Sequence, residues 1–280
     1  MDTKETLQRA AQLLRVADAL IITAGAGMGV DSGLPDFRGD EGFWNAYPAY
    51  RHLGLAFSDM ANPRWFEDNP ALAWGFYGHR LNLYRSTQPH AGFDVLRRFA
   101  NKMRHGAFVF TSNVDGAFQK AGFDPDRVME CHGSIHHVQC TKGCGVGILD
   151  ATGIRVNVDP QTFEAQGPLP KCPRCGELLR PNILMFGDPM WNYTRADSQE
   201  ERMMEWTRDL VDHNAAVVVL EVGAGTHIPS VRARSSSLSN RLNAPLIRIN
   251  TRDPEGLPGT LSVPMAAKEA LVELEILLGT

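Results

Sequence analysis

Four of the five cysteines in this chain of 280 residues form two pairs with the spacing of metal ligands. Cys140 and Cys144 form the first pair and Cys172 and Cys175 the second, within a stretch of short polar and Gly/Pro-rich pieces. Four thiolates in this pattern can close a tetrahedral zinc site, which would supply folding free energy that so polar a stretch lacks. Because sulfur would take every coordination position, such a zinc would be structural. The alternative is four unrelated thiols, and Cys131 is best explained as a small buried hydrophobe.

A second candidate for chemistry is the glycine-rich stretch TAGAGMGVDSGLPDFRG, which begins at Thr23. Gly25, Gly27 and Gly29 would let backbone N–H groups approach an anion closely, and the start of a following helix would add its positive dipole end. The stretch therefore favours a dinucleotide phosphate. It lacks the common G-x-G-x-x-G pattern, so a tight strand-to-helix turn that binds nothing is the alternative.

Polar side chains form a third group, in TSNVDGAFQKAG from Thr111 and in ECHGS from Glu130. Asn113 and Asp115 lie close behind an apolar run, and His132 follows further along the chain. Loops at the carboxyl ends of parallel strands converge on a ligand crevice, so these side chains are expected to meet there. A single histidine beside glycine is otherwise often only a hydrogen-bonded structural residue.

The composition limits the classes of function. The chain is 43% hydrophobic, its formal net charge is -4, and its pI is about 6.1. Such a chain can bury a large core, and without a long Lys/Arg run it is not expected to bind nucleic acid. It has no apolar run near the roughly 20 residues of a membrane span, and MDTKETLQRA does not resemble a secretion signal. We therefore expect a cytoplasmic protein without a membrane partner, whose cysteines bind metal rather than form disulfides.

The elements that would position these residues alternate between helix and strand. Apolar residues at helical spacing predict a helix over 5–18, and continuous apolar runs predict buried strands over 19–23, 107–112, 215–223 and 244–250. Continuous Val/Ile/Leu strands separated by helices are typical of a parallel sheet covered on both faces. The predicted fold class is therefore α/β.

Changes in residue composition along the chain also predict its division into domains. Residues 1–43, 86–137 and 180–280 are expected to form a Rossmann-like domain, with a helical or loop excursion over 44–85 and a small zinc-binding module over 138–179.

Taken together, the motifs resemble those of the sirtuins, the family of NAD-dependent protein deacylases. GAGMGVDSGLPDFRG, NVDG with KAG, HGS, the two cysteine pairs and LRPNILMFGD occur here in the family's order. The resemblance implies a Rossmann-like large domain, a small zinc domain, and NAD bound in the cleft between them. It also implies that Gly25 and Ala26 approach the pyrophosphate, and that Asp36, Phe37 and Arg38 form a flap over the nicotinamide ribose.

The resemblance implies roles for further residues. His132 would be the general base, and a neutral imidazole suits that task at cellular pH. Asn113, which the resemblance also places among the catalytic residues, would contact the ribose, and Asp115 the nicotinamide amide. Asn250 would meet the adenosine ribose. Acyl-lysine proteins or peptides would be the partners, pairing as an extra strand beside MFGD, that is, with Phe186 and Gly187.

Several positions depart from the family's pattern. Ser112 replaces the usual glutamine, Phe118 stands where many members have histidine, and Gly223, Ala224 and Gly225 replace Gly-Thr-Ser around the phosphate and ribose. These changes leave two alternatives to a deacylase open: an ADP-ribosyltransferase or NAD glycohydrolase, and a weakly active NAD-sensing module. Retention of His132 argues against the last, because a pure binder needs no base.

Acyl specificity is a further hypothesis. Tyr77 and Arg80 are three residues apart, so on a helix they share one face. Family members that prefer succinyl- or malonyl-lysine carry a similar Tyr-x-x-Arg. The arginine could pair with an acyl carboxylate and the tyrosine could donate a hydrogen bond to it. The alternative is a half-buried tyrosine beside a solvated arginine.

Overall fold

The computed structural model describes residues 2–36, 39–52 and 54–279. Within these ranges the elements follow in the order α1 (Thr3–Arg15), β1 (Ala19–Ala24), η1 (Ala26–Ser32), α2 (Gly39–Ala46), α3 (Pro48–His52), α4 (Phe57–Met60), α5 (Trp65–Asp68), α6 (Pro70–Ser86), α7 (Ala91–Lys102), β2 (Ala107–Thr111), α8 (Ala117–Lys120), η2 (Pro125–Arg127), β3 (Val128–Glu130), β4 (Gly133–Cys140), β5 (Ile148–Asp150), β6 (Asn157–Val158), β7 (Ala165–Gln166), β8 (Leu179–Ile183), α9 (Thr194–Asp212), β9 (Val217–Val222), α10 (Ser230–Leu242), β10 (Leu246–Ile249), β11 (Leu261–Val263) and α11 (Ala267–Leu278).

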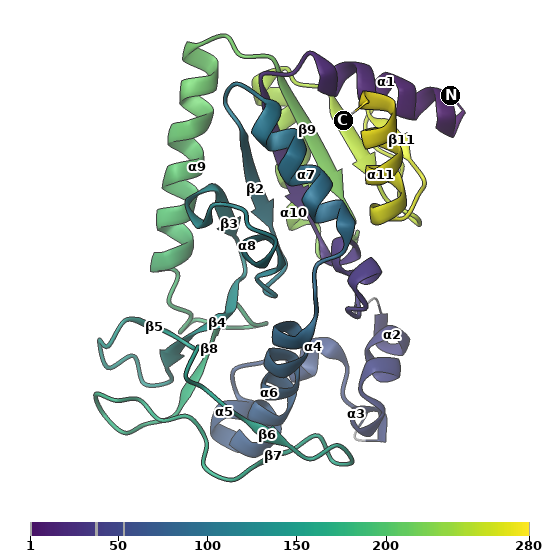
Figure 1. The fold of residues 1–280 in the computed structure, drawn as a ribbon. Coiled ribbons are helices and arrows are strands. Elements are labelled where there is room, and N and C mark those ends of the chain that lie inside the picture. The colour runs from purple at the N-terminus through teal and green to yellow at the C-terminus, as the bar shows by residue number, and fades with distance from the viewer. Residues whose placement is uncertain (1, 37–38, 53, 280) are drawn as a thin grey trace.

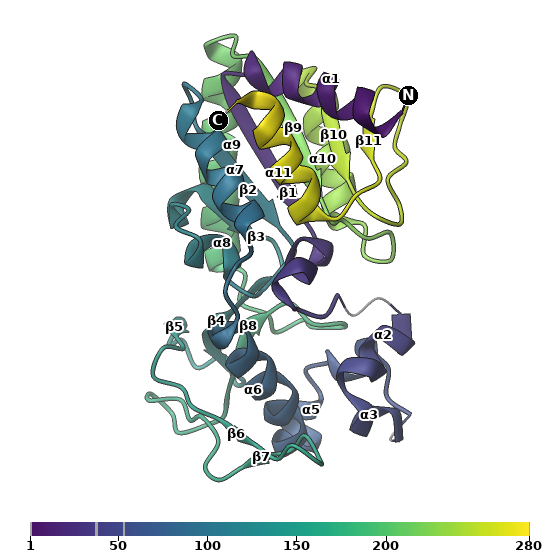
Figure 2. The same ribbon diagram turned by 45° about the vertical axis from the view of Figure 1, so that its right-hand side comes forward.

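The larger part of the molecule is built on a parallel sheet with the strand order β11-β10-β9-β1-β2-β3. The central strand β1 is buried along its whole length, as expected of an apolar strand covered on both faces. Helices α1, α7 and α11 cover one face, and α9 and α10 cover the other (Figures 1 and 2). The α/β fold predicted from the sequence is confirmed.

The smaller part of the molecule lies beyond the carboxyl ends of these strands, at the bottom of Figure 1. It contains the antiparallel sheet β5-β4-β8, the β6-β7 hairpin and the helices α2 to α6, which share a second apolar core. The indole N–H of Trp74 on α6 donates to the carbonyl oxygen of Leu179 on β8 at 2.8 Å, which ties the helical segment to this sheet. Strand β4 crosses the domain boundary expected at residue 138, and the domain limits remain a prediction. Among the described residues, no helix is long and apolar enough to cross a membrane.

Candidate active site and metal cluster

The candidate site lies where the loops that follow β1, β2, β3 and β9 meet. The loops after β1 and β9 are joined through their backbones, with Gly25 N donating to Val222 O and Gly27 N to Gly223 O, each at 3.0 Å. His132 lies in the two-residue connection between β3 of the large sheet and β4 of the small one. The sheet topology therefore brings these four loops to one edge, as expected for strand ends in an open α/β sheet.

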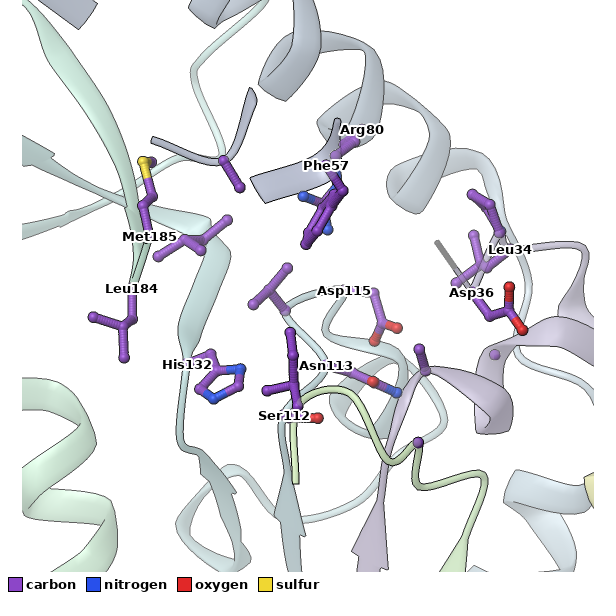
Figure 3. Close-up of a pocket in the computed structure, with 18 of the residues that line it drawn as sticks. Leu34, Asp36, Phe57, Arg80, Ser112, Asn113, Asp115, His132, Leu184 and Met185 are labelled. Carbon is purple, nitrogen blue, oxygen red and sulfur yellow. The ribbon is translucent and has the colours of Figure 1, made fainter. Parts of the chain in front are cut away.

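A cavity of about 500 Å³ opens at this edge. Figure 3 shows Phe57 and Arg80 on one side of it and His132, Ser112 and Asn113 on the other. This volume is in the range of cavities that enclose small molecules. The lining combines the loops of the large sheet with α4, α6 and the segment after β8, and comprises Ala26, Gly29, Leu34, Pro35, Asp36, Phe57, Ser58, Ala61, Tyr77, Arg80, Tyr84, Ser112, Asn113, Val114, Asp115, His132, Ile183, Leu184, Met185, Phe186, Gly225, His227 and Ile228.

The imidazole of His132 lines this cavity with hydrogen-bond partners on two sides. Its Nε2 lies 3.3 Å from Ser230 Oγ, and the ring also hydrogen-bonds to the Ser112 backbone. Burial lowers the pKa of His132, and the bond to Ser112 offsets part of this effect. The ring is therefore neutral near pH 7, the state that can accept a proton.

Asn113 and Asp115 are held by local bonds at the same edge. The Asn113 amide nitrogen donates to Gly25 O at 3.0 Å, which joins the β1 and β2 loops. The Asp115 carboxylate accepts from Ala117 N at 2.8 Å, and burial raises the pKa of this carboxyl above its usual value. A desolvated carboxylate facing a cavity is suited to accept a hydrogen bond from a ligand amide.

Tyr77 and Arg80 also face the cavity, and Tyr84 on the next turn joins them. Arg80 is 6% exposed, and its guanidinium donates through Nε and Nη2 to Tyr84 Oη at 3.0 and 2.9 Å. The buried hydroxyl of Tyr77 has no hydrogen-bond partner among the described residues. Neither side chain is solvated, so the simple surface interpretation of this pair is wrong.

A smaller cavity of about 90 Å³ lies beyond the glycine-rich loop, and Gly27, Gly223, Asn250 and Arg252 contribute to its lining. Asp36 lines both cavities. The Asn250 side chain is engaged within the protein: its amide nitrogen donates to Ala224 O at 2.8 Å, and its oxygen accepts from the Arg252 and Asp253 amides. Of the expected flap, Phe37 and Arg38 lie outside the described residues.

The expected peptide-binding segment is placed at the cavity mouth. Phe186 lines the cavity and is 41% exposed, whereas Gly187 is not among the lining residues. The amide of Phe186 already donates to Ala61 O at 2.8 Å, and the amide of Leu184 to His132 O at 2.9 Å. A peptide that pairs here would therefore need other backbone groups than these two amides.

The four paired cysteines come together at the end of the small sheet. Their sulfur atoms all lie within 4.8 Å of one another, with Cys140 and Cys175 3.6 Å apart and Cys144 and Cys172 also 3.6 Å apart. A disulfide needs about 2.05 Å, whereas zinc with four bonds of about 2.3 Å separates its sulfurs by about 3.8 Å. The cluster fits tetrahedral zinc. Cys131 lies apart from it, half-buried, and burial raises the pKa of its thiol to about 12.

Sequence reasoning missed several residues of the site. Tyr84 was recognisable, because it lies four residues after Arg80 on the same helical face. Phe57 and Ser230 carried no such signal, since they reach the cavity and His132 only through long-range folding.

A family model described as the Sir2 family matches residues 25–207. The chain belongs to the Sir2 family. Within it, the chain is 36% identical over 184 residues to an NAD-dependent protein deacylase of Thermococcus kodakarensis, covering 66% of this chain and 65% of that protein. It is 32% identical over 192 residues to the NAD-dependent protein deacylase sirtuin-5, mitochondrial, of Canis lupus familiaris, covering 63% and 58%. The chain thus matches less than two thirds of the length of these relatives.

Solved structures of the Sir2 family share the fold. One Sir2 homolog solved as an NAD complex has a TM-score of 0.68 and 24% identity, covering 97% of this chain and 93% of that one. A Sir2 homologue mutant solved with ADP-ribose has a TM-score of 0.70 and 24% identity, covering 97% and 96%. The likeness to the Sir2 fold therefore covers 97% of the chain and extends beyond the residues of the family match.

Proposed function

We propose that this Sir2-family chain is an NAD-dependent protein-lysine deacylase, which moves the acyl group of a modified lysine to ADP-ribose and releases nicotinamide. The observation that carries the proposal is the convergence of His132, Asn113 and Asp115 on one cavity, which Ala26 and Gly29 of the glycine-rich loop also line. The curated relatives named as NAD-dependent protein deacylases support it.

NAD, a substrate of this reaction, would lie across the glycine-rich loop. Its adenosine would occupy the smaller cavity near Asn250, and its nicotinamide ribose the larger one near Asn113. The start of the loop, at Gly25 and Ala26, would face the pyrophosphate, as would the segment Gly223–Gly225. Asp115 would accept from the nicotinamide amide.

We infer the steps from the resemblance to the family and from the cavity that His132 lines. The glycosidic bond of NAD breaks, nicotinamide leaves with the bonding electrons, and the acyl-lysine carbonyl oxygen attacks the ribose carbon. His132 Nε2 then takes the proton of a ribose hydroxyl, whose oxygen closes onto the imidate carbon. Water completes the transfer, releasing lysine and acylated ADP-ribose. The lowered pKa of His132 keeps the base neutral at the start of this sequence.

Ser112 favours a second candidate function. It lines the cavity in the position where the family usually has glutamine, and its short side chain can replace that ribose contact only from closer or through water. The loss of one such hydrogen bond is worth roughly 0.5–1.5 kcal/mol. A looser ribose could be captured by water or by another acceptor, as in an NAD glycohydrolase or an ADP-ribosyltransferase.

The acyl group would extend toward Tyr77 and Arg80, and we infer a preference for acidic acyl groups. A succinyl or malonyl carboxylate there could accept from the Arg80 guanidinium and from the Tyr77 hydroxyl, which has no partner among the described residues. A neutral acetyl group would leave that hydroxyl unsatisfied. The four clustered cysteines would hold a structural zinc ion. Zinc binding requires that these thiols stay reduced, which fits a cytoplasmic protein.

One incubation tests the function. The purified protein is mixed with NAD and an acyl-lysine peptide, and the products are separated by mass. Acylated ADP-ribose formed in equal amount with nicotinamide is the expected result. ADP-ribose formed without peptide, or ADP-ribose attached to protein, would support the second candidate instead. NAD left unchanged would overturn both.

A further inference from the structure

Ser230 is the first residue of α10, and its hydroxyl is the side-chain partner of the His132 imidazole, at 3.3 Å from Nε2. It does not line the cavity, so it reaches the site only through His132. Both residues are partly buried, and the contact joins β3-β4 to α10 across 98 positions of the chain.

The contact with Ser230 and the direction of the Ser112 effect on the pKa together favour one tautomer of the imidazole. The bond to the Ser112 backbone raises the pKa of His132, as donation from the ring to a carbonyl oxygen does. Because Nε2 faces Ser230, we assign this donor as Nδ1. Nε2 then carries the lone pair, and a serine hydroxyl can donate to it, since hydroxyls rotate to suit their partner.

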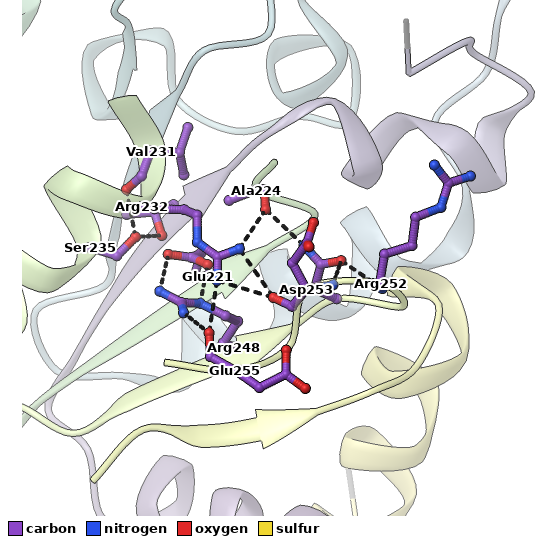
Figure 4. Close-up of polar contacts among 11 residues, drawn as sticks. Glu221, Ala224, Val231, Arg232, Ser235, Arg248, Arg252, Asp253 and Glu255 are labelled. Carbon is purple, nitrogen blue, oxygen red and sulfur yellow. Dashed lines mark hydrogen bonds and ion pairs between the residues drawn. The ribbon is translucent and has the colours of Figure 1, made fainter. Parts of the chain in front are cut away.

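Hydrogen bonds from neighbouring residues of α10 hold Ser230 in place beside His132. Arg232, two residues further along α10, donates to the carbonyl oxygens of Ala224, Asp253 and Glu255. Figure 4 shows these bonds gathered at the start of the helix. One turn on, the Ser235 hydroxyl donates to Val231 O at 2.8 Å and also meets the hydroxyl of Thr23 on β1. The first two turns of α10 are thus anchored to the loops after β9 and β10 and to the central strand β1.

Charged groups near this contact are already paired. Arg234 of α10 forms an ion pair with Glu200 of α9, and both act on the Cys131 thiol rather than on His132. The pKa shift of His132 has no contribution from a charged side chain; burial and the Ser112 bond are its causes. A change in the Ser230 hydroxyl should therefore be visible in the titration of His132 without interference from a nearby charge.

We propose that Ser230 is a positioning residue for His132, donating its hydroxyl proton to Nε2 of the neutral ring and rotating to accept from Nε2–H once the ring has taken a proton. The first bond fixes the direction of the Nε2 lone pair until a ribose hydroxyl takes the place of the Ser230 hydroxyl. The second stabilises the imidazolium. The role in turnover rests on the function proposed for His132, but the hydrogen bond itself does not.

Because a hydrogen bond to a charged group is the stronger of the two, losing the hydroxyl should disfavour the protonated ring. The test is an NMR titration of the ¹⁵N-labelled imidazoles, with His132 assigned through its loss in His132→Asn. In Ser230→Ala we expect the pKa of His132 to fall by about half a unit to one unit. Ser230→Thr, which keeps the hydroxyl, should restore it, and Ser237→Ala, at an exposed position of the same helix, should change nothing. An unchanged pKa and tautomer in Ser230→Ala would overturn the proposal.

Steady-state kinetics provide a second test of the role of Ser230. With saturating NAD and peptide, Ser230→Ala should lower kcat about tenfold and leave KM near its original value, and Ser230→Thr should recover most of the loss. Equal kcat in Ser230→Ala and wild type would count against the positioning role. If the wild-type protein turned over no NAD at all, the proposed function would fall, and the NMR titration would still decide the Ser230 contact.

Discussion

The carbonyl oxygen of Gly223 lies 2.7 Å from the position that a β-carbon would take on Gly25. Gly223 itself has φ of +65°, and a β-carbon there would lie 2.3 Å from Met28 N. The loops after β1 and β9 therefore pack backbone against backbone, with no room for a side chain on either. This close approach explains why glycine is needed at both positions although the usual dinucleotide pattern is missing.

Gly223→Ala should therefore destabilise the protein, by about 2 kcal/mol or more, because it combines strain at positive φ with overpacking against backbone. Gly225→Ala is the matched control, since a β-carbon there meets nothing within 4 Å. Thermal unfolding of both variants beside wild type measures the difference. Equal melting temperatures for the two variants would show that the loops can separate at little cost.

Removal of one cysteine ligand should release zinc and loosen the small sheet. In Cys172→Ala, the metal content should fall from stoichiometric to near zero and the melting temperature should drop, because the cluster lies at the end of β4 and β8. Cys131→Ala, outside the cluster, should keep its zinc. Metal analysis and thermal unfolding check both variants. Unchanged metal in Cys172→Ala would remove the cluster as a zinc site.

His90 makes stability depend on pH. Its Nδ1 accepts from Gly92 N at 3.0 Å at the start of α7, so its Nε2 carries the proton and donates to Met28 O at 2.9 Å. Burial lowers the pKa of His90 in the folded state. The folded chain thus binds this proton less readily than the unfolded chain, so the contribution to stability is full above about pH 6.5 and is lost as the pH falls through the folded-state pKa.

His90→Asn should flatten this dependence, because asparagine can cap the helix but does not titrate. Urea unfolding between about pH 7.5 and about pH 5 would measure it in both proteins. We expect wild type to lose more stability than the variant over this interval. Parallel losses would assign the acid sensitivity to other groups.

The elements that sequence predicted best are those whose signal is local. The strand over 19–23 is a continuous apolar run and is found as Ala19–Ala24, because a buried parallel strand needs apolar residues on both faces. Strands β3 and β11 have only three residues each, too few to show a period, and the sequence did not indicate them. The cysteine cluster was predictable because the ligand spacing is itself local.

The rest of the site depends on contacts between distant segments. Phe186 N is bonded to Ala61 O, and His132 to Ser230, and neither pairing leaves a trace in the residue types or their spacing. The burial of Arg80 likewise follows from α4 and α6 closing over the cavity. The sequence motifs identified residues that line the cavity, but not the distant residues that hold them in place.

His132→Ala should lose acyl transfer by about 10²–10⁴-fold, the usual effect of removing a general base, and should still bind NAD. Turnover by product mass and NAD affinity by calorimetry give the two readings. His213→Ala, at an exposed position after α9, is the control and should match wild type in both. A His132→Ala protein with near-normal turnover would exclude this residue as the base.

The acyl preference is tested at α6. Wild type should favour succinyl- over acetyl-lysine peptide in kcat/KM, and Arg80→Met should reverse this order mainly by weakening the succinyl substrate. Charge-assisted hydrogen bonds are worth about 1.5–3 kcal/mol, which corresponds to a loss of roughly 10- to 150-fold. Methionine keeps much of the buried apolar volume, so the fold should persist, which thermal unfolding can verify.

Tyr77→Phe separates acyl recognition from packing. Its hydroxyl is buried and forms no bond with the described residues, so its removal should cost the fold little, whereas the succinyl substrate should lose a donor. Tyr84→Phe removes the hydroxyl that accepts from Arg80 Nε and Nη2, so it should affect both stability and succinyl turnover. Succinyl kinetics unchanged in Arg80→Met and Tyr77→Phe would contradict the hypothesis and leave Arg80 a structural residue that binds the Tyr84 hydroxyl one turn further along α6.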